Sequence, residues 1–312
     1  MRSTTWIAAL LALATVPPLA AQEPKCNDAN AQVQAACNAA VDAYATFQPL
    51  AGIAISGGNP ELGTARALGG FPHLFGSFRV NLVKATVPNP DTTQKAITGG
   101  VPAPVVEAGL GVWPGLSGGL LAVDVLGSAT LLPTGLDKLS VDPNAAKVGD
   151  LALGIGYGVR VGVLKGSFPI PSVSVSAMRR TIPRVQYGSL AAGDQFEFDT
   201  DLKATTIRVA ASMRLLFVDA TAGFGFDKYS STAHLRFYDN PPLNTNIRTV
   251  PLDRSNSRQV LFLNAGLDLM AAKLVGELGY QTGKDQNLSK TYTDFDPKAG
   301  HVYGGIGFRF SF

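Results

Sequence analysis

Two of the three histidines in this sequence lie near carboxylates and come closest to a catalytic constellation. His234 lies shortly before Asp239, and His301 follows Asp294 and Asp296. A histidine held by a carboxylate can act as a general base in a hydrolase. However, the chain has no G-x-S-x-G segment, no paired cysteine and histidine, and no phosphate-binding loop. The histidines are therefore predicted to be polar rim residues, and the chain is predicted not to be an enzyme.

The two cysteines, Cys26 and Cys37, are the other side chains with reactive chemistry. In an oxidising compartment they are predicted to form a disulfide, with free or buried thiols as the alternative. Two cysteines and three scattered histidines do not make a metal site. Neither a metal nor any other cofactor is expected. The net charge of +3 comes without a basic stripe, so no nucleic-acid partner is expected.

From residue 73 onward, charged side chains fall mostly on the opposite parity from apolar ones. In residues 150–165, Leu151 and Val159 share the apolar parity, whereas Arg160 lies on the other. Successive side chains of a strand point to opposite faces, so the charges are predicted to share one face of a sheet. The polar face comprises Arg79, Asn81, Glu107, Asp124, Arg160, Arg180, Arg208, Arg214, Asp219, Asp227, Asn264, Asp268, Lys273, Glu277 and Arg309. Its seven basic and six acidic residues nearly balance, which predicts ion pairs in a confined interior.

The elements that must position these charges are strands. Ten stretches can carry one: 74–86, 103–113, 118–131, 150–165, 169–182, 201–215, 216–230, 257–270, 271–284 and 300–312. Short turns alternate with long polar links, as in transmembrane barrels with tight periplasmic turns and longer outer loops. The predicted fold is therefore all-β, a transmembrane antiparallel up-and-down β-barrel of about ten strands, with 12–14 as the alternative. A soluble β-sandwich is the competing fold, but the long strands and glycine-rich polar faces favour the barrel.

Residues before the barrel have a different composition. Residues 1–21 are predicted to be a signal peptide, with Arg2 before an apolar stretch and Ala20-Ala21 at the cleavage site. Residues 22–72 are predicted to form an N-terminal helix and linker that plug the lumen, cap its periplasmic mouth or lie free. The amphipathic helix covers 27–48 and is predicted to end before Pro49. Residues 73–312 make up the barrel.

The last twelve residues, HVYGGIGFRFSF, alternate between an apolar and a small or polar face and end on an aromatic residue. This strand resembles the closing strand of bacterial outer-membrane β-barrels, in which Phe308, Phe310 and Phe312 would form the assembly signal. The resemblance implies secretion across the inner membrane, location in the outer membrane, and contact with its lipid and with the barrel assembly machinery. Aromatic residues near strand ends are predicted to form interfacial girdles: Trp113, Tyr157, Tyr229, Tyr280 and Tyr303.

The predicted lumen has two interpretations: charges that neutralise one another and fill a narrow barrel, or a wet pore whose charges set selectivity. The N-terminal hatch, with Asn59-Pro60 and the small-residue run 63–70 after it, is similar to that of FadL-type channels for fatty acids and aromatic hydrocarbons. That resemblance implies binding of hydrophobic molecules and their release through the wall. The sequence thus predicts a narrow porin-like channel or binding barrel for a small-molecule solute. A closed structural or adhesive barrel is the alternative, and an outer-membrane hydrolase ranks last.

Overall fold

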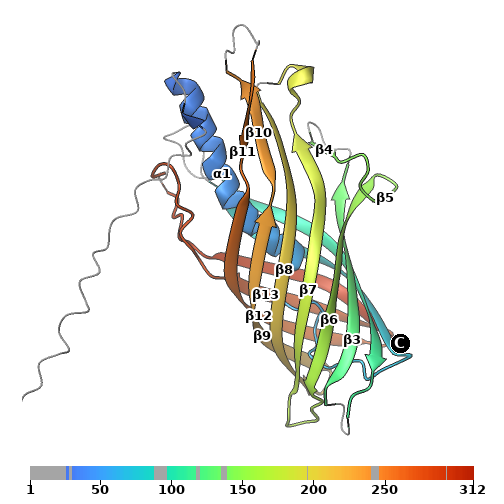
Figure 1. Ribbon diagram of the computed structural model, residues 1–312. Coiled ribbons are helices and arrows are strands. Elements are labelled where there is room, and N and C mark those ends of the chain that lie inside the picture. Colours follow the sequence, from blue (N-terminus) through green and yellow to red (C-terminus); the bar gives the residue numbers. More distant parts are fainter. Residues whose placement is uncertain are drawn as a thin grey trace, which may run out of the picture.

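The computed structural model describes residues 26–27, 30–87, 97–116, 120–134, 139–194, 196–239, 246–292 and 294–312 (Figure 1). Ten of its fourteen strands form the wall of a closed antiparallel barrel, which confirms the predicted fold class. The wall strands are β1 (Leu74–Val87), β2 (Ile97–Trp113), β3 (Ala122–Pro133), β6 (Leu151–Leu164), β7 (Ser172–Tyr187), β8 (Phe196–Leu215), β9 (Val218–Ser231), β12 (Arg254–Leu269), β13 (Ala272–Gln281) and β14 (His301–Ser311). The predicted signal peptide lies outside the described residues.

The barrel closes between its first and last strands. β1 pairs antiparallel with β14, from Phe75 opposite Ser311 to Val83 opposite Tyr303. Beyond this ladder, the amides of Leu74 and Phe312 each donate to the other's carbonyl oxygen, at 3.1 and 2.9 Å. The seam therefore leaves no free sheet edge in the wall, as a spanning barrel requires.

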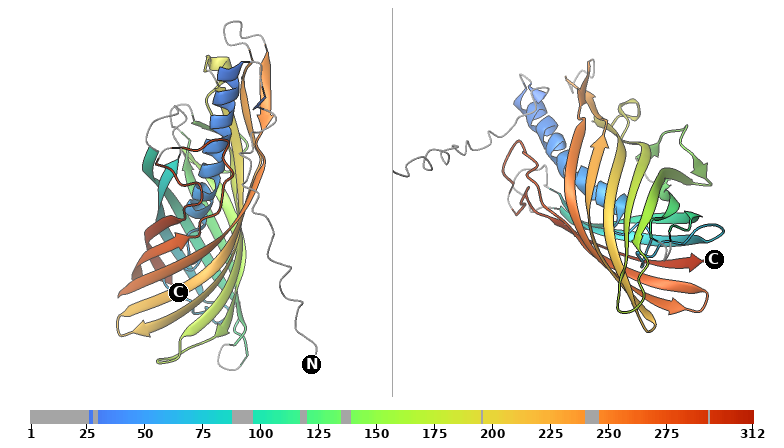
Figure 2. Two further views of the ribbon diagram at one scale, coloured as in Figure 1. Left: turned by 90° about the vertical axis from the view of Figure 1, so that its left-hand side faces the viewer. Right: turned by 60° about the horizontal axis from the view of Figure 1, so that its bottom comes forward.

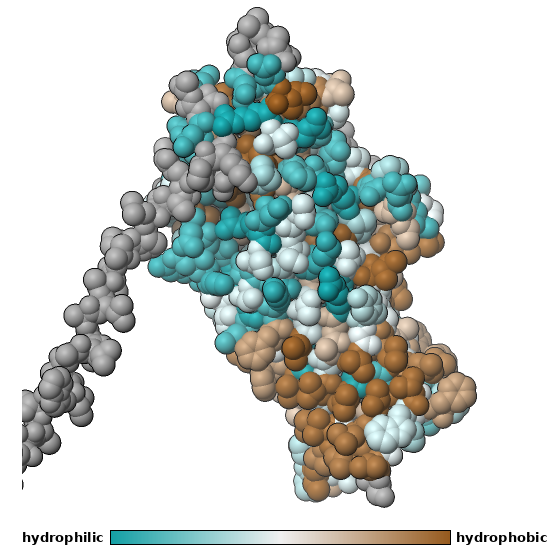
Figure 3. All heavy atoms as spheres, viewed as in Figure 1, coloured by the Kyte–Doolittle hydropathy of each residue, from teal (hydrophilic) through white to brown (hydrophobic). Residues whose placement is uncertain are grey.

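The apolar parity of the strands faces outward. In β12, Leu261 and Leu263 are 55% and 61% exposed, whereas Phe262 and Asn264 are 2% and 4% exposed. On the face shown in Figure 3, apolar side chains form a band around the lower part of the barrel. The upper part, which carries α1 (Ala31–Ser56) and the long loops, is mostly polar. The surface is thus divided into an apolar belt and a water-facing extension.

The wall extends beyond the belt at its long-loop end. β8 is 20 residues long, and its first residues pair with β10 (Ala233–Tyr238), which pairs with β11 (Ile247–Pro251). On the other side, β4 (Leu139–Val141) extends β7 and β5 (Lys147–Val148) extends β6. Figure 1 shows this tall sheet with α1 lying against it. The extra strands thus build a structured rim.

α1 is longer than the sequence predicts. It begins after Asn30, whose side chain accepts a hydrogen bond from the Gln32 amide, and it continues through Pro49 to Ser56. The prediction that the helix ends before Pro49 is wrong. Proline removes one helical hydrogen bond, but Leu50 and Ile53, which are fully buried in the barrel core, offset this loss. Within the described residues, no helix is long and apolar enough to cross a membrane.

α1 enters the barrel from the long-loop end, and the chain after it runs through the lumen to the short-turn end (Figure 2). Ser56 lies against Arg79 inside the wall, whereas the Leu68 amide reaches Asp124. The Gly111 amide donates to the His73 carbonyl where β1 begins. The N-terminal part of the chain therefore lies at the opposite end of the barrel from the start of β1.

Candidate functional site

Residues 57–65, here called the lumen segment, occupy the interior of the barrel. Every residue of this segment is buried, and Glu61, Leu62 and Ala65 are fully inaccessible. The sequence predicts a linker here because of its glycines and Pro60. In the structure this segment lies inside the barrel, and charged side chains of the wall bind it.

Two arginines of the wall hold the turn that follows α1. Arg79 donates from Nη2 to the Ser56 carbonyl at 3.1 Å and from Nη1 to the Asn59 carbonyl at 3.0 Å. Arg208 donates from Nη2 to the Gly57 carbonyl at 2.9 Å and from Nε to the Gly58 carbonyl at 2.8 Å. The last carbonyls of a helix lack partners and carry partial negative charge, so buried cations stabilise this end.

A carboxylate of the wall binds the backbone amides of the same turn. Glu277 accepts hydrogen bonds from the amides of Gly58 and Asn59 at 2.7 and 3.0 Å. Gly57 has a φ of 59°, and a Cβ there would lie 2.9 Å from the Arg79 guanidinium. A Cβ on Gly58 would lie 2.7 Å from the Phe262 side chain. Glycine is therefore needed where the backbone passes this close to the wall.

The arginines of the wall also have carboxylate partners. Glu107 accepts from Arg79 at 3.1 Å and from Arg180 at 2.8 Å, and Arg208 pairs with Asp227. Arg79, Arg180 and Arg208 are at most 1% exposed. An unpaired charge at such depth would cost several kcal/mol, so these pairs are needed for the fold as well as for contact with the lumen segment.

Glu61 is a central residue that is not among the predicted lumen residues. It pairs with Arg160 from β6 and with Arg309 from β14, which reaches it at 2.5 Å. Arg160 also donates to Asp124 at 2.6 and 2.9 Å. The sequence does contain one indication of a further acidic residue in the lumen, because the predicted lumen face has seven basic but only six acidic residues. Glu61 from the segment supplies the seventh acid.

The remaining predicted charges lie near the short-turn end. Lys273 pairs with Asp219 and lies 3.4 Å from Asp268, and Arg214 pairs with Asp268. Arg214 is 60% exposed in its side chain, so this group faces the mouth of the barrel. The structure thus places the predicted lumen residues in a buried group around the lumen segment and in a second group at the mouth.

Two of the aromatic residues predicted for interfacial girdles lie inside the barrel. Tyr229 and Tyr303 are 0% and 1% exposed, and the Tyr229 hydroxyl donates to Asp227. That part of the girdle prediction is wrong, because both residues lie on the inward parity of their strands. Trp113 and Tyr280 are 44% and 43% exposed and lie on the outer surface.

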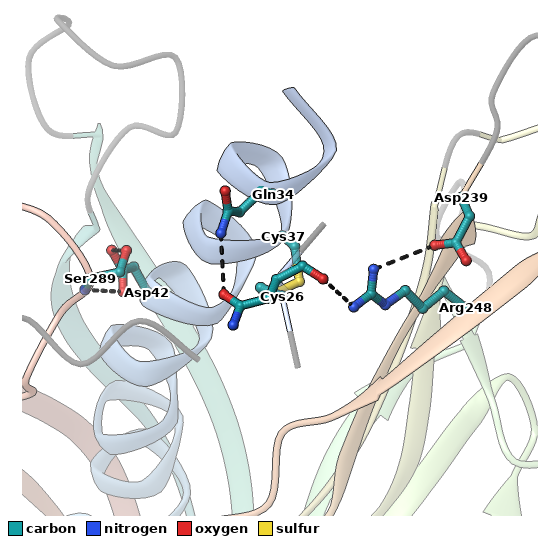
Figure 4. Close-up of a disulfide and its surroundings, with 8 residues drawn as sticks. Cys26, Gln34, Cys37, Asp42, Asp239, Arg248 and Ser289 are labelled. Carbon is teal, nitrogen blue, oxygen red and sulfur yellow. Dashed lines mark hydrogen bonds and ion pairs between the residues drawn. A yellow bond between two sulfur atoms is a disulfide. The ribbon is translucent and has the colours of Figure 1, made fainter. Parts of the chain in front are cut away.

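A second assembly lies at the long-loop end. The rim module is defined as Cys26, the part of α1 before Pro49, β10, β11 and residues 282–292. Cys26 and Cys37 form a disulfide, which confirms that prediction, and both are buried (Figure 4). They pack with the apolar side chains of β10 and β11 and of the residue that follows β11. These are Ala233, Leu235, Val250 and Leu252. The first turns of α1 are thus fixed to the extended sheet.

Asp42 fixes the other side of α1 to residues 282–292. Its carboxylate accepts from the Ser289 amide at 2.8 Å and from the Ser289 hydroxyl at 2.7 Å (Figure 4). It also accepts from the Tyr292 hydroxyl at 2.8 Å. Burial, followed by the hydrogen bond and charge of Asp42, raises the pKa of Tyr292. Tyr292 therefore stays a neutral donor at physiological pH.

Replacing Cys26 and Cys37 by serine should loosen the rim module without opening the barrel. The bond closes a loop with a sequence separation of 11, for which loop-closure entropy gives about 3 kcal/mol. We expect proteinase K to cleave the first turns of α1 much faster in the double variant, with the heat stability of the barrel unchanged. A loss of barrel stability equal to the loss of protease resistance would contradict a local role.

The histidines occupy separate places. His234 Nδ1 lies 3.1 Å from Asp199, not near Asp239, and Arg184 binds the same Asp199 oxygen at 2.9 Å. His73 Nδ1 lies 2.9 Å from the Gly70 carbonyl at the short-turn end. His301 begins β14. Within the described ranges, no three His, Cys, Asp or Glu side chains gather as metal ligands.

No protein-family model matches the chain, and no curated protein matches its sequence. Several solved structures have a similar overall arrangement, and they are bacterial outer-membrane β-barrels. The outer membrane protease OmpT from Escherichia coli is 11% identical, with 77% of this chain and 97% of that chain covered and a TM-score of 0.43. The translocator domain of autotransporter NalP from Neisseria meningitidis is 11% identical, with 88% and 98% covered and a TM-score of 0.42. Neisserial surface protein A is 9% identical, with 77% of this chain and 97% of that chain covered and a TM-score of 0.29.

One prediction is corrected by these comparisons. The chain was predicted not to be an enzyme, but the similar barrels include a protease, so a barrel of this kind is no ground for excluding catalysis. The resemblance to FadL-type channels gains no support from them. At these identities the comparisons concern the fold alone, and no activity is transferred from them.

Proposed function

We propose that this protein is a closed outer-membrane barrel whose function is to present the rim module on the cell surface. In this proposal the short turns and β14 face the periplasm, and the long loops face outward, as is usual for bacterial barrels. The outer membrane lipid contacts the apolar belt, and the assembly machinery reads the strand that contains Phe308, Phe310 and Phe312. The N-terminal signal directs secretion across the inner membrane.

The observation that carries this proposal is the burial of the lumen segment. Residues 57–65 fill the interior at the level of Arg79, Arg208 and Glu277, and they are bound there through their own backbone. A segment held by several charge-assisted hydrogen bonds is a permanent part of the fold, since each such bond contributes about 1.5–3 kcal/mol. This arrangement favours the filled lumen over a selective pore.

The rim module supports a surface role for a second reason. It has its own apolar core, a disulfide and the buried Asp42, all beyond the apolar belt. A barrel that served only to span the membrane would not need this structure. A rigid helix packed against an extended sheet can display a binding surface, and in this proposal that surface binds a partner outside the cell.

Planar-bilayer recordings test this proposal against the channel that the sequence first suggested. The refolded protein should show no steady ion conductance, because the proposal holds that the buried lumen segment obstructs the barrel. A variant that lacks residues 31–65 and still folds should conduct, since the obstruction is gone. Steady conductance of the intact protein would contradict the closed barrel. A deletion variant that folds but does not conduct would show that the lumen segment is not what closes the barrel.

A further inference from the structure

Below the lumen segment, the short-turn end of the barrel contains a cavity of about 810 Å³. Thr64, Arg66 and Leu68 line it from the chain that leaves the lumen segment, and the wall strands and their turns supply the rest. Glu61 and Leu62, which precede these residues in the chain, are fully buried. This cavity, here called the cup, is lined in part by exposed short-turn residues at the end of the barrel, so a ligand can reach it from that end.

The lining of the cup has more basic than acidic side chains. Five Arg or Lys side chains contribute to it, against Asp219 as its one acidic side chain. Three of these five have carboxylate partners: Arg214, Lys273 and Arg309. In the part of the chain that the structure describes, Arg66 and Lys165 make no ion pair, and both are exposed. Two cations are thus available to an anion in the cup.

The cup is also apolar at its rim. Phe168 and Leu216 line it and are 73% and 89% exposed. They belong to the short turns, and on the face shown in Figure 3 the apolar band continues down to this end of the barrel. A ligand in the cup would therefore meet cations and, at the rim, apolar side chains. A lipid head group at the membrane surface has this combination of properties, whereas a free ion has only the charge.

We propose that the cup binds the phosphate-bearing head group of an anionic phospholipid from the adjacent leaflet. Arg66 and Lys165 contact the head group, and the apolar rim receives the first part of the acyl chains. Binding at this site is independent of the rim module, so it goes beyond the surface role proposed above.

Calorimetry tests this site with the protein in phosphatidylcholine nanodiscs, and with empty nanodiscs as the blank. The probes are dihexanoyl phosphatidylglycerol, dihexanoyl phosphatidylcholine and inorganic phosphate. We expect saturable binding of phosphatidylglycerol alone. The double variant Arg66→Gln/Lys165→Gln should bind it about tenfold more weakly, since each partly exposed ion pair contributes modestly. The control Lys147→Gln removes an exposed lysine from the other end of the barrel and should bind like the parent protein.

Three results would overturn the proposal. Equal binding of phosphatidylcholine would show that the charge is not recognised. Saturable binding of inorganic phosphate with the same affinity would identify a free anion as the ligand. Unchanged binding by the double variant, with its heat-modifiable migration intact, would place the lipid elsewhere on the barrel.

Discussion

Replacing Arg208 by methionine is expected to lower the free energy of unfolding by about 3–5 kcal/mol, which is typical of breaking a buried ion pair. The substitution leaves Asp227 buried without its cation and removes the donors to the carbonyls of Gly57 and Gly58. Methionine fills much of the same volume, so the loss reports charge and hydrogen bonding more than packing. Urea unfolding in phospholipid vesicles, followed by far-UV circular dichroism, measures the change.

Two controls make this result specific. Arg179→Met changes the same residue type on β7, where the side chain is exposed, and should alter stability by no more than about 0.5 kcal/mol. Arg208→Met/Asp227→Asn should recover part of the loss, because no charge is then left unpaired. Equal effects of Arg208→Met and Arg179→Met would contradict a wall built around the lumen segment.

Replacing Gly58 by valine is expected to be nearly as damaging, with a loss of about 1–3 kcal/mol or failure to reach the folded state. A Cβ at this position would lie 2.7 Å from the Phe262 side chain and 2.8 Å from the Glu277 carboxylate. The added methyl groups would displace the turn from the carboxylate that binds its amides. Heat-modifiable migration and urea unfolding of the refolded variant measure the effect.

Gly276→Val is the matched control for this substitution. Gly276 lies in β13, next to Glu277 in the chain, and a Cβ there would have no neighbour within 4 Å. Valine also suits a strand better than glycine does. We expect stability equal to or slightly above that of the parent protein. Tolerance of valine at Gly58 would mean that the lumen segment can leave its position without cost.

The wall was predictable because a barrel has a simple periodic sequence. In β12 the alternation of Leu261, Phe262 and Leu263 determines the face of each residue once the apolar parity is assigned to lipid. The predicted stretch 257–270 therefore falls close to the observed Arg254–Leu269. Strand parity also placed Arg79, Arg160 and Arg208 inside, where the structure has them.

The lumen segment was not predictable in the same way, because its conformation depends on contacts distant in sequence. Pro49 is a helix-breaking residue by local rules, yet α1 continues because Leu50 and Ile53 are buried by the wall. Glu61 sits among Gly and Pro residues that favour a loop, and its partners Arg160 and Arg309 are remote in the chain. Sequence periodicity carries no information about such long-range ion pairs. The excess of one basic residue on the predicted lumen face did indicate that one acidic partner comes from elsewhere in the chain.

The course of the chain through the barrel is the central claim, and cysteine labelling in intact cells tests it most directly. Gln32 lies in the exposed first turn of α1, and Met270 lies fully exposed in a short turn at the other end. Each is replaced by cysteine with the disulfide retained, and cells are treated with a maleimide carried on a polymer too large for porins. We predict labelling of Gln32→Cys in intact cells and of Met270→Cys only after the envelope is permeabilised. Labelling of Met270→Cys in intact cells, with Gln32→Cys protected, would contradict the account.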